Sequence, residues 1–180
     1  MNNDDGNGHA NVYAAFGIRR RINAAGTLTR LGGSLMAPHV TAAMAAAATQ
    51  SVDIAELQAA ASRTIARITG AEAGLVSTGA AAALTLAAAA CMTRWNIGKM
   101  AALPHAEGFA HEILIPRTHR TGYAHALSAS GARLVDIGHN DRACGAGVRG
   151  LEPWEIESAI TPGTVAFAFS ANPESIAEFP

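Results

Sequence analysis

The stretch GLVSTGAAAALTLAAAAC (residues 74–91) joins a short apolar run, a Ser-Thr-Gly turn and an alanine-rich segment. It admits two interpretations: a membrane span, or a buried strand that ends in a turn and is followed by a helix. Alanine gives little drive for membrane insertion, and Ser77, Thr78 and Thr85 interrupt the run. Small side chains instead let a helix pack closely against a sheet. We therefore expect a strand over 74–77, a helix over 79–92 and no membrane span.

Composition narrows the class of protein. The 180 residues suffice for one domain with a core, and 13 Lys and Arg against 14 Asp and Glu give a formal charge of −1. Scattered arginines argue against a nucleic-acid partner. Cys91 and Cys144 form neither a disulfide framework nor a zinc spacing, and the histidines match no compact ligand pattern, so we expect a cytoplasmic protein without a metal site.

Apolar runs and helical patterns alternate along the chain. Runs without polar alternation predict strands over EILIP (112–116), RLVDI (133–137) and TVAFAFS (164–170). We expect helices over 37–49, 53–69 and 122–129 and from Pro153, and a loop over 94–110. Strands that are apolar throughout and separated by helices indicate an α/β fold, with a mostly parallel sheet flanked by helices.

Ligands of such sheets bind beyond the carboxyl ends of the strands. The turn at Thr78, Gly79 and Ala80 lies there, where a helix N-terminus offers amides to a phosphate and Gly79 allows close approach. The alternative is an ordinary turn in which Ser77 or Thr78 caps the helix. His119 follows the next strand at the same edge, so its imidazole could stack on a planar ring, or could be a solvated loop histidine.

Two further patterns each have a functional and an ordinary interpretation. Arg117 and Arg120, which flank His119, could bind an anionic substrate or could be surface arginines. GAGVRG (145–150) matches a dinucleotide-binding pattern by letter, but no strand immediately precedes it and no helix opens inside it, so we expect a loop.

Four segments in the same order resemble one family of pyridoxal-phosphate-dependent enzymes. They are INAAGTLTRLGGSLM (22–36), VDIAELQ (52–58), TGAEAGLVSTGAAAALTLAAAACM (69–92) and RTHRTGYAHA (117–126). The family is that of selenocysteine synthase (L-seryl-tRNA(Sec) selenium transferase), especially its D-glucosaminate-6-phosphate ammonia-lyase-like branch. The resemblance runs from about residue 16 to residue 172.

The resemblance implies the N-terminal portion of the aspartate aminotransferase-like large domain, in a homo-oligomer with active sites at a dimer interface. It divides the chain into a flexible leader (1–15), an N-terminal arm (16–36) and an incomplete α/β large domain (37–180). It implies pyridoxal 5′-phosphate as cofactor and a small amino acid or amino-sugar acid as substrate. The residues implied are Thr78, Gly79 and Ala80 for the cofactor phosphate, His119 for stacking, Asn172 for the cofactor hydroxyl, and Arg30 for a place near an active site. With Arg120, chosen for its position beside His119, Arg30 is expected to bind substrate.

The sequence also departs from the family pattern. Family members are longer, and beyond the strand that matches 164–170 they carry an Asp for the pyridine nitrogen and a Schiff-base lysine. The only lysine here is Lys99, in WNIGKMAALP, which does not resemble that site. We therefore expect the N-terminal part of a lyase or transferase of β-elimination or ammonia-lyase type, with no catalytic residue of its own. The alternative is an inactive relic or a standalone phosphate-binding half-domain.

Overall fold

The computed structural model describes residues 12–138 and 151–171. The chain divides into two units, Met1–Ile54 and Ala55–Pro180, and each is described by itself.

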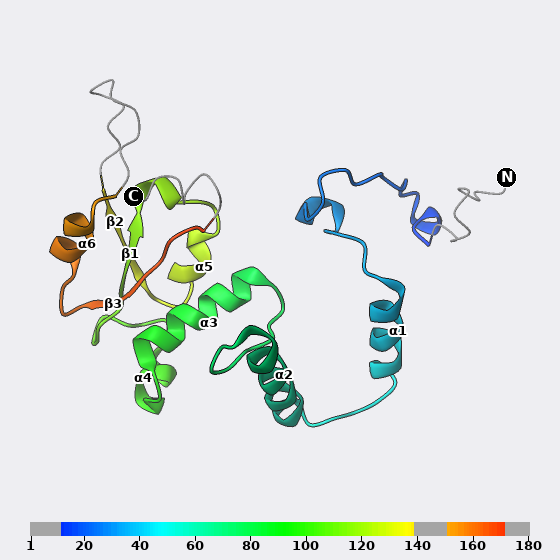
Figure 1. Ribbon diagram of the computed structural model, residues 1–180, viewed down its shortest axis with the longest axis horizontal. Coiled ribbons are helices and arrows are strands. Elements are labelled where there is room, and N and C mark those ends of the chain that lie inside the picture. The colour runs from blue at the N-terminus through cyan, green and yellow to red at the C-terminus, as the bar shows by residue number, and fades with distance from the viewer. Residues whose placement is uncertain (1–11, 139–150, 172–180) are drawn as a thin grey trace, which may run out of the picture. The chain divides into compact units, whose positions relative to one another are not determined.

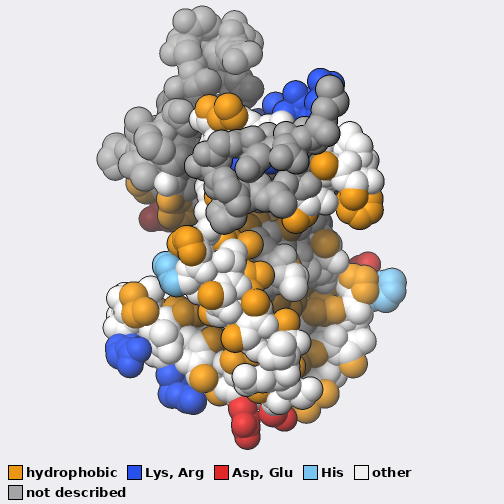
Figure 2. Space-filling view, turned by 90° about the vertical axis from the view of Figure 1, so that its right-hand side faces the viewer, with side chains coloured by type: hydrophobic (Ala, Val, Ile, Leu, Met, Phe, Trp, Pro, Cys, Tyr) orange, Lys and Arg blue, Asp and Glu red, His pale blue; other side chains and the backbone are white. Residues whose placement is uncertain are grey.

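The described residues of the first unit form short helical elements. They are the 3-10 helices η1 (Ala14–Phe16) and η2 (Thr29–Leu31) and the α-helix α1 (Pro38–Ala47), close to the predicted helix 37–49. None of their residues is buried. Large apolar side chains of this unit reach the surface, with Ile22 and Leu35 each 97% exposed. Hydrophobic side chains are also visible on the face drawn in Figure 2. The described residues of this unit therefore bury no hydrophobic core among themselves.

The predicted strand over 74–77 is wrong: the segment lies along helix α2 (Ile54–Thr69) and pairs with no strand in the described chain. The Gln58 side chain donates to the carbonyl of Val76 at 2.6 Å and accepts from its amide at 3.3 Å. Ser62 accepts from the amide of Gly74 at 3.1 Å. Side chains of α2 therefore take the hydrogen bonds that a neighbouring strand would otherwise make.

Two helices follow this segment. Helix α3 (Ala80–Thr93) matches the predicted alanine-rich helix, but α4 (Ile97–Ala102) lies where a loop was predicted. An N-cap stabilises the start of α4, because the Asn96 side chain accepts a hydrogen bond from the amide of Lys99 at 2.9 Å. In the described residues, no helix is both long enough and apolar enough to cross a membrane.

The sheet has three parallel strands in the order β2-β1-β3, as predicted for an α/β fold. Strands β1 (Glu112–Pro116) and β2 (Arg133–Ile137) have the predicted bounds, whereas β3 (Thr164–Phe167) ends earlier than predicted. The β1–β2 register aligns Glu112 with Arg133 and Pro116 with Ile137. Each strand therefore ends at the same edge of the sheet.

Helices cover both faces of this sheet (Figure 1). Helices α3 and α5 (Ala124–Ser128) pack on one face, over a core that includes Met92, Ile113 and Leu127. Helix α6 (Pro153–Ala159) covers the other, where Leu114 and Ile137 are buried. Across the first face, Thr85 of α3 donates to the carbonyl of Ala126 in α5 at 2.7 Å. This contact joins α3 to α5.

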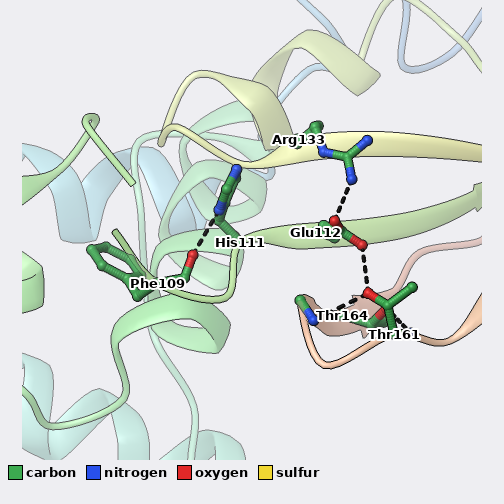
Figure 3. Close-up of polar contacts among 7 residues, drawn as sticks. Phe109, His111, Glu112, Arg133, Thr161 and Thr164 are labelled. Carbon is green, nitrogen blue, oxygen red and sulfur yellow. Dashed lines mark hydrogen bonds and ion pairs between the residues drawn. The ribbon is translucent and has the colours of Figure 1, made fainter. Parts of the chain in front are cut away.

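An ion-pair network closes the opposite, amino edge of the sheet (Figure 3). Glu112 at the start of β1 accepts from the Thr161 hydroxyl at 2.9 Å and pairs with the guanidinium of Arg133 on β2. The hydrogen bonds from Thr161 and Arg133 lower the pKa of the Glu112 carboxyl below its usual 4.5. The charged carboxylate therefore joins β1 to both neighbouring segments.

Glu112→Gln tests this network by its pH dependence. Because folding lowers the pKa of Glu112, its contribution to stability is fully present above pH 4.5 and is lost as pH falls through the lower pKa of the folded state. We expect the melting temperature of the variant to fall less than that of wild type when the pH is lowered from 5 to 3. Glu157→Gln, at an exposed position of α6, is the control and should follow wild type.

Candidate functional site

The turn before α3 presents an open, uncapped helix N-terminus. Gly79 is the N-cap residue, with φ 121° and ψ 170°, and no side chain caps the helix. The Ser77 hydroxyl donates to the carbonyl of Gly79 at 3.0 Å, so the alternative in which Ser77 or Thr78 caps the helix is wrong. A methyl group on Gly79 would meet no atom within 4 Å. The first amides of α3 therefore face open space, where an anion can approach them.

His119 lies at the carboxyl edge of the sheet, as predicted, but it is not a solvated loop residue. It ends the 3-10 helix η3 (Arg117–His119), which directly follows β1, and its exposed fraction is only 5%. Its Nδ1 accepts a hydrogen bond from the backbone amide of Ser170, beyond β3, at 3.1 Å. The imidazole is therefore held between the ends of two neighbouring strands.

A cavity of about 270 Å³ opens beside this ring. Its lining includes Leu84 of α3, Ile115 of β1, His119, Tyr123, Phe169 and Ser170. The volume is close to the lower end of small-molecule sites, about 300–1,000 Å³. An apolar wall with an imidazole on one side suits a flat aromatic ring.

A second, wider hollow lies toward the start of α3. It has a volume of about 790 Å³ and is lined by Ala81, Ala82 and Thr85 of α3 together with the segment 121–123. Thr121 and Tyr123 line both spaces. The first turn of α3 and the His119 ring therefore lie on either side of one short segment. These residues fit a group that has an aromatic ring and a phosphate.

The predicted substrate arginines are placed differently. The Arg120 Nε lies 2.7 Å from Oδ1 of Asp136 on β2, and Arg120 does not line the cavity beside His119. Arg30 belongs to η2, in the first unit. Asn172 and the GAGVRG segment (145–150) lie outside the described residues.

Lys99 lies at the far end of α3 from the turn. Helix α3 has 14 residues, which corresponds to about 21 Å, and α4 with Lys99 follows its C-terminus. The Lys99 Nζ lies 5.2 Å from the centroid of the Phe109 ring. Lys99 is absent from the lining of both spaces near His119.

Sequence reasoning missed three contributors to the cavity: Tyr123, Phe169 and the amide of Ser170. Phe169 stacks on Phe167 of β3, with ring centroids 5.9 Å apart. Phe169 and Ser170 follow a strand and Tyr123 precedes α5, so the rule that ligands bind beyond strand ends could have indicated them. Within the described residues, no three His, Cys, Asp or Glu side chains gather as a metal site would require.

Comparisons with known proteins show what the chain is similar to. The chain is 32% identical over 163 residues to D-glucosaminate-6-phosphate ammonia lyase from Salmonella typhimurium (strain 14028s / SGSC 2262), covering 88% of this chain and 42% of that protein. It is 29% identical over 166 residues to 5′-C-glycyluridine monooxygenase-decarboxylase from Streptomyces sp, covering 89% of this chain and 40% of that one. No family model matches the chain.

A solved structure supports the same relationship. The fold matches a structure of D-glucosaminate-6-phosphate ammonia lyase with a TM-score of 0.79 at 32% identity, over 88% of this chain and 42% of that one. The chain spans about two fifths of the length of the curated relatives that it matches. The chain is therefore homologous to a part of D-glucosaminate-6-phosphate ammonia lyase.

Proposed function

We propose that this chain forms the phosphate- and ring-binding part of a pyridoxal-phosphate site in a lyase of the ammonia-lyase type, acting on an amino acid or amino-sugar acid. When bound, pyridoxal phosphate supplies an electron sink for bond cleavage at the α-carbon of an amine substrate. The observation that supports this function is the buried His119 ring beside a cavity, in the same unit as the uncapped start of α3. We also propose that the protein is a cytoplasmic homo-oligomer.

Each part of the site has its own task. Thr78, Gly79 and Ala80 would hold the phosphate, because backbone amides and the positive end of the helix dipole meet there. His119 would cover one face of the cofactor ring and keep water from it, since the imidazole is itself buried. Asn172 is proposed for the cofactor hydroxyl.

The substrate would be bound separately. Arg30 and Arg120 are proposed for its acidic groups. The Nε of Arg120 is taken by Asp136, so Arg120 could bind an anion only through its terminal nitrogens. Lys99 is proposed to have no catalytic role.

Titration with pyridoxine 5′-phosphate tests the site directly. This probe has the ring and phosphate but no aldehyde, so it does not label amino groups. We expect saturable binding, at least tenfold tighter than that of unphosphorylated pyridoxine, because the helix N-terminus recognises the phosphate. Equal affinity for the two compounds would contradict the proposal, and equal affinity for inorganic phosphate would favour a phosphate-binding module instead.

A further inference from the structure

The hydrogen bond between Ser170 and His119 determines where the imidazole carries its proton. A backbone N–H can only donate, so the Nδ1 that faces the Ser170 amide at 3.1 Å is the acceptor and carries no hydrogen. In the neutral ring the proton therefore sits on Nε2, which is buried. The same bond also restricts rotation of the ring about its χ2 angle.

The amide of Ser170 is held in place by the sheet. The amide of Ala168, two residues earlier, donates to the carbonyl of Leu114 in β1 at 2.8 Å. Because alternate residues of an extended strand direct their amides to the same side, the Ser170 amide also faces the β1 side. The chain has by then left β1 for η3, and the His119 ring supplies the next acceptor. The imidazole thus continues the pattern of hydrogen bonds between β1 and β3.

We propose that the backbone amide of Ser170 is a positioning group, which fixes the orientation of the His119 ring and its Nε2–H tautomer. This inference rests on the proposed function, because the oriented ring is the surface on which the cofactor ring would stack. Because the donor is a backbone amide, every residue except proline, which has no amide hydrogen, can supply it.

Nitrogen-15 NMR of the wild-type chain tests the bond without any ligand. We expect His119 as the Nε2–H tautomer, and a scalar coupling between the Ser170 amide nitrogen and Nδ1 of His119 across the hydrogen bond. A hydrogen on Nδ1 in the neutral ring would overturn the proposal. Since this readout needs no cofactor, it holds whether or not the chain binds one.

A pair of variants tests what the bond does. Ser170→Ala keeps the amide, so we expect it to keep the Nε2–H tautomer of His119. Ser170→Pro removes the amide, so we expect mixed tautomers and about three- to tenfold weaker binding, the effect of losing one hydrogen bond. Circular dichroism shows whether each variant is folded. If the proline variant is unfolded, the nitrogen-15 NMR spectrum of the wild-type chain alone tests the proposal.

The outcomes separate the two proposals. Wild type that binds the probe, with a folded Ser170→Pro variant that binds it equally well, would overturn the positioning role and leave the proposed function intact. Wild type that shows the coupling but binds no pyridoxine 5′-phosphate would overturn the proposed function while the tautomer assignment holds.

Discussion

Gly131→Ala will unfold at a markedly lower temperature than wild type. Gly131 joins α5 to β2 with φ +98°, a conformation that side chains rarely adopt, and a methyl group there would overlap the backbone carbonyl oxygen of Pro104. Backbone strain and overpacking together predict a loss of about 2–5 kcal/mol in the free energy of unfolding. For a chain of this length this corresponds to a fall of roughly 10 °C in the melting temperature, measured by circular dichroism.

Gly108→Ala is the matched control. A methyl group at Gly108 meets no atom within 4 Å, and Gly108 is not among the glycines with positive φ. We expect its melting temperature to stay within about 2 °C of wild type. Equal melting temperatures for the two variants would show that the segment carrying Pro104 does not pack against Gly131 as described.

His119→Ala will weaken binding of pyridoxine 5′-phosphate by about tenfold or more, because it removes the proposed stacking surface and enlarges the cavity. The ring is 5% exposed and lies between the ends of β1 and β3, so the variant will also lose some stability. Binding is therefore measured by calorimetry at a temperature at which circular dichroism shows the variant to be folded.

His105→Ala serves as the control for His119→Ala. His105 is exposed and lines neither space near His119. Its variant should bind the probe as wild type does. If instead a folded His119→Ala variant matches wild type, the cofactor ring does not lie against His119.

The sheet could be predicted largely because its strands are apolar throughout. EILIP and RLVDI form β1 and β2 with the expected bounds. The segment 74–77 is equally apolar, but the side chains of Gln58 and Ser62 in α2 form hydrogen bonds with its backbone. A hydrophobic pattern does not predict such side-chain to backbone hydrogen bonds. Helix α4 was missed for the converse reason: Asn96 caps a short helix in a stretch that contains Gly98 and Pro104.

The candidate site could be predicted only where it depends on chain position. His119 follows the apolar run that forms β1, so the rule for parallel sheets predicted its place at the carboxyl edge. The same rule was applied to the turn at Gly79, but the segment before that turn is not a strand of the sheet. Arg120 and Asp136 are 16 positions apart and meet because β1 and β2 are neighbouring strands. No local sequence pattern predicts this ion pair. The donor at Ser170 is a backbone amide, which every residue except proline has, so no side chain indicates it.

Mapping of backbone amide and imidazole NMR signals during titration with pyridoxine 5′-phosphate tests the site most directly. We predict that the largest saturable shifts fall on the amides of Gly79 and Ala80 and on the His119 ring. Shifts confined to the surroundings of Lys99, or none that saturate, would contradict a site built from the start of α3 and the imidazole beyond β1.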